Sequence, residues 1–452
     1  FLRILFICEC RGEWASFVAA VLIVLIPKSD GGRRPIGLLP FFPRIWMRVR
    51  HEVIQQWENS TAIQRDYFYA GPARGAHVAT WRQGFRAELA RLKRDAYAQA
   101  LLDLVKAFER VPWHILQREG AELGFPLWLL RLSIATYQLA RVVRVDFAVS
   151  CFIFPYRGIV AGSVNATAEM KLILIRIVDR ACSIAPTVKP SIYVDDAAAE
   201  DSGLADEVES NVVAWVDAFC AGVQESEMEV SPTKCCCLAS NREMGTRIQT
   251  RLKTHGWHVP HVSTAKSLGS DMTAGLRRST ALANQRLAVF VSRYRRWRAL
   301  GAAGVDLARL ARSGGTATIT YGQAIMGVAD SQLHKQRSAM AAQAAPGAGI
   351  HGQNLDVALM MLDGSPKGRA DPAFEAHGAP IGQWAMAVWY ELVPLQEMHD
   401  VVADSNTRLS QAARPWSAVR GNGAALVATA ARLHWEVHDA THIKTDTGRV
   451  LS

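Results

Sequence analysis

Residues 191–196 of this chain read Ser-Ile-Tyr-Val-Asp-Asp (SIYVDD), a β-branched and aromatic run that ends on two adjacent carboxylates. Such a run is typical of a β-strand, and it places Asp195 and Asp196 at the tip of a hairpin. An acidic pair taken alone is more often only a polar turn. The segments around it decide between these two interpretations.

A third carboxylate follows another strand-like segment upstream. Residues 97–102 (YAQALL) lead into Asp103, which would share a strand face with Leu101 because side chains two apart point the same way. A hairpin tip that carries Asp195 and Asp196 beside this strand would collect three hard oxygen ligands. Such a set suits Mg²⁺ and phosphoryl transfer with two metal ions.

Six segments, in order, resemble a reverse transcriptase of the type carried by non-LTR (LINE-like) retrotransposons. They are 24–28 (VLIPK) with 34–40 (RPIGLLP), 103–113 (DLVKAFERVPW, motif A), 158–163 (GIVAGS, motif B), 193–196 (YVDD, motif C), 231–234 (SPTK, motif D) and 266–269 (KSLG, motif E). Any one of them alone is a weak signal, but the ordered set is specific.

The resemblance implies an α+β, right-hand polymerase fold. Fingers and a palm with an antiparallel sheet would be followed by a helical thumb and a mostly helical C-terminal region. We expect fingers over 1–95, a palm with the catalytic motifs and some fingers insertion over 96–262, a thumb-like basic helical region over 263–344, and helices of unknown role over 345–452. Residues 345–380 are rich in Gly, Pro and Ala and predict a loose linker with short helices.

The resemblance also assigns roles by position. Asp103, Asp195 and Asp196 would be catalytic and would bind Mg²⁺ (or Mn²⁺), with the backbone carbonyl of Leu104 as a further metal ligand. The expected nucleotide-binding residues are Lys28, Arg34, Phe108, Gly162, Ser163 and Lys234. Phe108 stands where the family places the residue that excludes a ribose 2′-hydroxyl, and ordinary core packing is the alternative.

Arginines recur in the helical stretch that follows motif E. In the family this stretch is the thumb, and the predicted nucleic-acid-binding residues are Arg277, Arg278, Arg293, Arg295 and Arg296. Arginine contacts to phosphate supply affinity without sequence specificity, although a solvated basic helix face is the alternative. The formal net charge of +10 suits a polyanionic partner. The expected partners are an RNA template, a DNA primer and deoxynucleoside triphosphates.

Motif B departs from the family pattern G-x-P-Q-G-S, because Val160 replaces the proline and Ala161 the glutamine. That glutamine normally contacts the templating region and the incoming nucleotide. Its loss leaves open a catalytically inactive domain that only binds nucleic acid. An RNA-templated RNA polymerase or a maturase-type splicing cofactor is a further alternative, although the wording of motif A favours the non-LTR type.

Other features bear on class and location. The eight cysteines show no zinc-site spacing, and a nuclear or cytoplasmic location suits them better than secretion. The apolar residues 17–26 are too few to span a bilayer and predict a buried strand, so no membrane partner is expected. Trp384, Trp389 and Trp435 are expected in the core of the C-terminal region. The chain begins near the fingers, which suggests a fragment without an upstream endonuclease domain.

Overall fold

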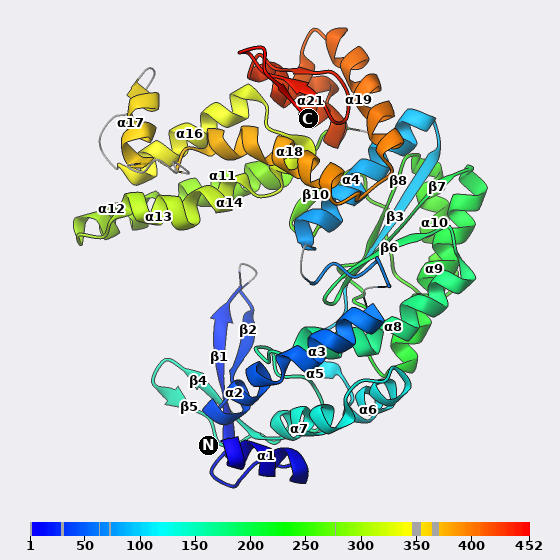
Figure 1. Cartoon of the computed structure of the whole chain (residues 1–452), viewed down its shortest axis with the longest axis vertical. Coiled ribbons are helices and arrows are strands. Elements are labelled where there is room, and N and C mark those ends of the chain that lie inside the picture. The colour runs from blue at the N-terminus through cyan, green and yellow to red at the C-terminus, as the bar shows by residue number, and fades with distance from the viewer. Residues whose placement is uncertain are drawn as a thin grey trace.

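The structure, a computed structural model, describes residues 2–28, 31–62, 64–71, 74–275, 277–345, 354–363 and 370–452 (Figure 1). It has the predicted α+β, right-hand polymerase fold. Two four-stranded sheets lie in the N-terminal part, and the chain beyond the second sheet is mostly helical. None of the described helices is both long and apolar enough to cross a membrane.

The fingers are built on a sheet with the strand order β2-β1-β4-β5. Its strands are β1 (Ala20–Pro27), β2 (Arg33–Leu38), β4 (Ala140–Val145) and β5 (Ala148–Val149). β1 runs parallel to β4 and antiparallel to β2. The apolar run therefore does form a strand. Its Val21 and Ile23 are buried in the main core, which also includes residues of helices α1 (Leu2–Arg11), α2 (Phe41–Val49), α3 (His51–Trp57) and α7 (Leu127–Tyr137).

The palm is an antiparallel sheet with the strand order β6-β7-β3-β8. Its strands are β3 (Ala96–Leu102), β6 (Lys189–Tyr193), β7 (Asp196–Gly203) and β8 (Cys236–Ala239). Helices α8 (Ala166–Ile184), α9 (Ala205–Glu225) and α10 (Arg242–Thr254) pack with it through a core that includes Trp215 and Phe219, both fully buried.

Helix α4 (Ala76–Lys93) lies between the palm sheet and the C-terminal region. On the palm side Arg86 forms an ion pair with the buried Glu200 of β7. On the other side Trp81 and Phe85 pack against Trp384, with ring centroids 5.8 and 6.1 Å apart. α4 therefore contacts both the palm sheet and the C-terminal region, and the division at residue 95 stays a prediction.

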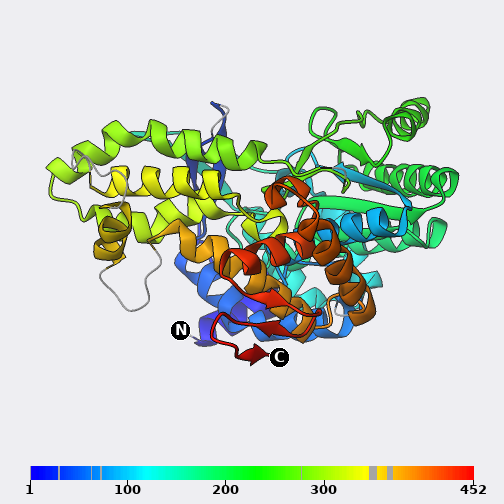
Figure 2. The ribbon, with the colours of Figure 1, turned by 90° about the horizontal axis from the view of Figure 1, so that it is seen from above.

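The thumb-like helices form a separate lobe, seen at the left of Figure 2. They are α11 (Ala281–Ser292), α12 (Tyr294–Ala302), α13 (Leu307–Leu310), α14 (Thr316–Thr320), α16 (Asp330–Ala344) and α17 (Asn354–Asp363). Phe290, Trp297 and Met340 form their core together with Leu355 and Leu359 of α17. Parts of the predicted linker, 346–353 and 364–369, lie outside the described residues, but α17 between them packs with the thumb-like helices.

The C-terminal region contains α18 (Pro372–Trp389), α19 (Leu395–Ser410), α21 (Asn422–Arg432) and a small sheet of β11 (Glu436–Val437), β12 (Ile443–Lys444) and β13 (Val450–Leu451). Trp384 is buried as predicted, and Trp435 is partly buried. The prediction for Trp389 is wrong, because this side chain is 82% exposed. Five residues along a helix turn a side chain well away from the buried face.

Candidate catalytic site

Strand register brings the three predicted carboxylates to one end of the palm sheet. Leu102 of β3 lies opposite Ala197 of β7, so the next residue, Asp103, comes level with Asp196. Tyr193 pairs with Asp196 across the β6–β7 hairpin, which leaves Val194 and Asp195 as its two-residue turn. The hairpin and the neighbouring strand thus bring these three residues to the same end of the sheet.

The hairpin turn has a strained backbone. Val194 has a φ of 61°, a left-handed conformation that two-residue turns normally give to glycine or asparagine. A β-branched residue held there costs about 1–3 kcal/mol, and the surrounding structure must supply that energy. Backbone hydrogen bonds from Tyr69 to Ile192 (2.8 Å) and from Ile192 to Tyr67 (2.7 Å) hold the strand just before the turn. The position of Asp195 is therefore strongly constrained.

Negative charge is concentrated at this end of the sheet. Burial raises the pKa of Asp195, and the nearby Asp103 carboxylate adds to that effect. Burial together with the charges of Asp195 and Asp103 raises the pKa of Asp196 to about 6. The ammonium of Lys234 lies 3.0 and 3.2 Å from the two carboxylate oxygens of Asp103, which raises the pKa of Lys234. The three carboxylates therefore repel one another and favour a cation between them.

The donor set fits a hard divalent cation by its chemistry. Carboxylate oxygens are the ligands that Mg²⁺ prefers. Because the three carboxylates repel one another, a bound cation would stabilise their ionised forms. Within the part of the chain that the structure describes, no group of three or more His, Cys, Asp or Glu side chains is arranged so that it could hold a metal ion. Leu104 is buried and bridges Val230, while Ser231 N–H donates to the Asp103 carbonyl at 2.7 Å. These bonds fix the backbone on which the predicted carbonyl ligand lies.

Motif B joins the fingers to the palm through a glycine contact. Gly37 of β2 donates its N–H to the carbonyl of Ala161 at 2.8 Å. Gly162 has a φ of 115°, and a Cβ atom there would lie 2.6 Å from the Gly37 carbonyl oxygen. The hydroxyl of Ser163 is buried and lies 2.8 Å from the hydroxyl of Tyr137. A nucleotide contact at Ser163 would therefore use its backbone, and this role stays a prediction.

Phe108 lies in a short helical turn, α5 (Ala107–Arg110), which follows Asp103 and the end of β3. Its ring is half-buried against the main core, and its carbonyl accepts the N–H of Ile159 at 2.7 Å. Motif A and motif B are therefore tied together at this residue. Both interpretations of Phe108, sugar contact and core packing, are compatible with a half-buried ring.

The predicted fingers cations lie on the β1–β2 hairpin. Lys28 is exposed at the turn and donates its backbone N–H to Gly32 at 2.8 Å. Arg34 is exposed on β2, opposite Ile26. Figure 1 shows this hairpin as an arm that projects from the fingers. The two cations thus belong to a different sheet from the aspartates.

The predicted nucleic-acid-binding arginines fall into two groups. Arg293, Arg295 and Arg296 are exposed where α11 meets α12, and Arg277 is exposed beside Ser263. Arg278 is half-buried instead and donates to the carbonyls of Met326 (3.1 Å) and Gly327 (3.0 Å). Burial lowers the pKa of Arg278 to about 10. Its guanidinium holds the start of the thumb against α15 (Gln323–Met326). Sequence alone cannot distinguish this structural role from phosphate binding.

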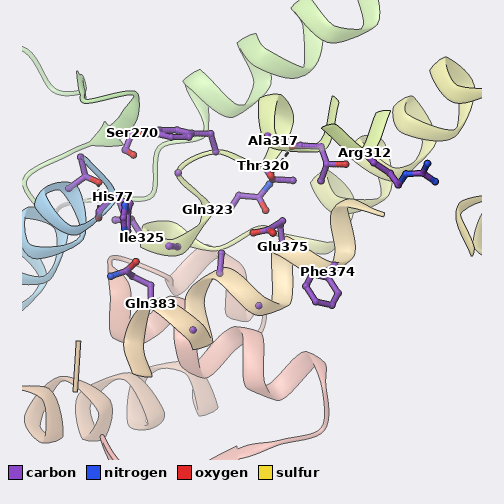
Figure 3. Close-up of a pocket in the computed structure, with 18 residues that line it drawn as sticks. His77, Ser270, Arg312, Ala317, Thr320, Gln323, Ile325, Phe374, Glu375 and Gln383 are labelled. Carbon is purple, nitrogen blue, oxygen red and sulfur yellow. Dashed lines mark hydrogen bonds between the residues drawn. The ribbon is translucent and has the colours of Figure 1, made fainter. Parts of the chain in front are cut away.

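Two cavities are relevant to the site, and of the two only the first is lined by residues of the β6–β7 hairpin. A cavity of about 770 Å³ lies between α3, α8 and the hairpin and is lined by Tyr193, Val194 and two cations that sequence reasoning missed, Arg74 and Lys171. Lys171 is buried, and its Nζ lies 2.5 Å from Oε1 of Glu58. This ion pair joins residues that are far apart in sequence, so only the folded structure reveals it. The cavity of about 580 Å³ in Figure 3 lies at the base of the thumb between α14, α15 and α18, and none of the three aspartates lines it.

Comparisons with known proteins give one family match. The sequence model of the family described as "Reverse transcriptase (RNA-dependent DNA polymerase)" matches residues 26–271, more than half of the chain. No curated protein matches.

Similar solved structures include apo telomerase from Candida tropicalis truncated from its C-terminal domain, with 12% identity, a TM-score of 0.41 and coverage of 57% of this chain and 54% of that one. Telomerase from Candida albicans in complex with a TWJ fragment of telomeric RNA has 11% identity, a TM-score of 0.43 and coverage of 88% and 64%. The chain spans less than two thirds of the length of either.

Proposed function

The chain belongs to the reverse transcriptase (RNA-dependent DNA polymerase) family, and from this premise we propose that it extends a DNA primer on an RNA template with deoxynucleoside triphosphates. The observation that carries the proposal is the meeting of Asp103, Asp195 and Asp196 at one end of the palm sheet. The residue sequence of motif A supports a non-LTR retrotransposon origin. Such a protein acts inside the cell, in the nucleus or the cytoplasm.

The proposed roles follow from charge and position. Mg²⁺ or Mn²⁺ bound by the three aspartates and the Leu104 carbonyl would activate the primer 3′-hydroxyl and neutralise charge on the α-phosphate. Lys234, beside Asp103, protonates or contacts the leaving pyrophosphate. The ring of Phe108 excludes a ribose 2′-hydroxyl.

The remaining residues bind the substrates. Lys28 and Arg34 on the fingers arm hold the triphosphate, while Gly162 and the backbone of Ser163 allow close approach of the nucleotide and template. The exposed thumb arginines, Arg277, Arg293, Arg295 and Arg296, contact backbone phosphates of the template–primer duplex. Arg278 supports them by fixing the base of the thumb. In the predicted division of the chain, the triphosphate-binding cations belong to the fingers, the metal-binding aspartates to the palm and the duplex-binding arginines to the thumb.

Primer extension tests the proposal. The protein is incubated with a labelled DNA primer on an RNA template, Mg²⁺ or Mn²⁺, and either deoxynucleotides or ribonucleotides. We expect products whose length follows the RNA template and that form with deoxynucleotides. Products formed without a template, or formed only with ribonucleotides, would contradict the assignment.

A nucleic-acid-binding domain without catalysis is the second candidate. Ala161 stands where the family has glutamine, and it lines a cavity of about 220 Å³ with Ile159 and Val160. No amide side chain from motif B can then reach the nucleotide. Tight binding of the primer–template with no extension in either metal would favour this candidate.

A further inference from the structure

The cavity of about 580 Å³ in Figure 3 takes no part in the proposed function. It lies where several parts of the chain meet. Helices α14 and α15 at the base of the thumb and α18 of the C-terminal region line it, together with β10 (Ser270–Met272) and the start of α4, from which His77 and Thr80 come. Its volume is that of a site for a small organic molecule. The groups that line it decide which molecule would fit.

Two buried amide side chains line this cavity with an atom that has no hydrogen-bond partner among the residues that the structure describes. The atoms are Oε1 of Gln323 on α15 and Nε2 of Gln383 on α18, and these residues are only 5 and 7% exposed. A buried polar group without a hydrogen bond destabilises a fold, so each such group needs an explanation. A ligand that donates to Gln323 and accepts from Gln383 would satisfy both.

The orientation of the Gln323 amide is fixed by its neighbours. The carbonyl of Ile319 can only accept, and it accepts a hydrogen bond of 3.2 Å from Nε2 of Gln336. Oε1 of Gln336 therefore faces Gln323 and accepts from its Nε2 at 3.0 Å. The oxygen of Gln323 is thus left as the unpartnered acceptor, and this assignment does not depend on the usual ambiguity of amide groups.

One face of α18 forms the floor of the cavity. It carries Glu375, Gly378, Ala379, Gly382 and Gln383, which recur at helical spacing. A Cβ atom added at Gly378 or Gly382 would meet nothing, so close packing does not explain glycine in this helix, where it costs stability. The small residues leave a flat surface between the half-buried Glu375 and Gln383, which start about 12 Å apart along the helix axis.

The cavity therefore presents two acceptors, Oε1 of Gln323 and the carboxylate of Glu375, and one donor, Nε2 of Gln383. Its flat floor suits a planar ring. Among the nucleobases, guanine has the matching edge, with the donors N1–H and N2–H₂ beside the acceptor O6. The arginine of the lining, Arg312, already donates to the Leu362 carbonyl at 2.8 Å, so the lining favours a neutral base over a phosphate.

We propose that this cavity binds a guanine base, presented by a free nucleoside or by an unpaired position of a bound strand. Binding here does not depend on the proposed function, because none of the three aspartates lines the cavity. A bound base would contact the thumb base and α18 together, and would hold these elements in one arrangement. Guanosine should therefore raise the melting temperature of the protein.

Titration calorimetry of the full chain with guanosine, adenosine and uridine tests the proposal. We expect a Kd of roughly 10–100 µM for guanosine, the range that ordinary binding efficiency gives a ligand of this size, and at least about tenfold weaker binding of the other two. Gly382→Leu covers the floor and should abolish binding. Ala385→Leu, at an exposed position of the same helix outside the lining, is the matched control. Asp195→Asn should keep guanosine binding, which separates this cavity from the catalytic site.

Inosine, which lacks the 2-amino group of guanosine, tests the role of Glu375. It should bind the wild type roughly tenfold more weakly than guanosine, because one hydrogen bond to a carboxylate is lost. Glu375→Ala should bind the two nucleosides equally. Both ligands are compared on the same protein, so a change in the stability of the variant does not affect the result.

A strand with one guanine distinguishes the two sources of the base. The probes are an oligouridylate of about 12 nucleotides and the same strand with one central guanosine. A preference for the second strand that free guanosine abolishes would assign the cavity to an unpaired base of a strand, and guanosine binding without that preference would assign it to a free nucleoside. Equal affinity for the two strands together with no saturable guanosine binding would overturn the proposal, as would guanosine binding that Gly382→Leu leaves unchanged.

Discussion

At the scale of single residues, Phe108 separates two physical roles. If its ring excludes a 2′-hydroxyl, Phe108→Ala opens room for one small group and admits ribonucleotides. The fold should survive, because a half-buried ring contributes less than the about 3–5 kcal/mol lost on truncating a fully buried phenylalanine. We expect the ratio of deoxynucleotide to ribonucleotide incorporation to fall sharply while the melting temperature drops moderately. Phe108→Tyr keeps the ring and should keep the ratio. An unchanged ratio with a large loss of stability would assign Phe108 to the core alone.

Glu169 couples stability to pH beneath motif B. Burial raises its pKa from 4.5 to about 7, although its Oε2 accepts a hydrogen bond of 2.5 Å from Tyr137, whose hydroxyl also meets Ser163. The folded state therefore holds a proton that the unfolded state releases. Stability is highest below the unfolded pKa and falls by up to about 3 kcal/mol as pH rises through the folded pKa.

Urea unfolding at about pH 5 and about pH 8 measures this effect in the wild type and in Glu169→Gln. We expect the glutamine variant to lose less stability between the two pH values, because it has no proton to release. Identical pH dependence in the two proteins would show that Glu169 is not the responsible group.

At the scale of elements, the contact between motif B and β2 depends on two glycines. In Gly162→Ala the new Cβ would meet the Gly37 carbonyl oxygen, and the residue would keep a φ that side chains rarely adopt. We expect a loss of about 1–3 kcal/mol in unfolding free energy and a weaker hold on the incoming nucleotide. The control is Gly382→Ala on α18, where a Cβ meets nothing and the helix should gain about 0.5–1 kcal/mol. If the Gly162→Ala protein were as stable as the wild type, the motif B loop would be able to move away from Gly37 at no cost, and the contact would not contribute to stability.

Sequence patterns predicted the elements whose signals are local. The β-branched and apolar residues before Asp103 and Asp195 predict the two strands. Once these strands pair, their register brings the carboxylate residues to the same end of the sheet. The contacts of helix α4 could not be predicted, because its partners, such as Glu200 and Trp384, are distant in sequence. The carbonyl contacts of Arg278 and the buried Lys171–Glu58 pair could not be predicted for the same reason. An arginine or lysine looks the same in a sequence whether it binds phosphate, a carbonyl or a carboxylate.

At the scale of the whole molecule, α4 fastens the C-terminal region to the palm. The buried carboxylate of Glu88 accepts the backbone N–H groups of Gly423 (2.8 Å) and Ala424 (3.2 Å) at the start of α21, and lies 3.5 Å from Arg408. Glu88→Ala leaves these donors unpaired, so we expect a loss of about 3 kcal/mol. Thermal unfolding and limited proteolysis between α18 and α21 measure the change. Undiminished stability and protease resistance would contradict the bracing role of α4.

The central claim is that Asp103, Asp195 and Asp196 together form the catalytic centre, and single-turnover primer extension by Asp195→Asn tests it most directly. Loss of one ligand should abolish extension, because it removes several kcal/mol of charge stabilisation in the transition state. Duplex binding should persist, since it rests on many phosphate contacts. The melting temperature should not fall, because the variant removes charge repulsion among the three neighbouring carboxylates. Asp206→Ala, at an exposed acid on α9, is the control and should extend primers normally. Extension by Asp195→Asn at close to the wild-type rate would contradict the account.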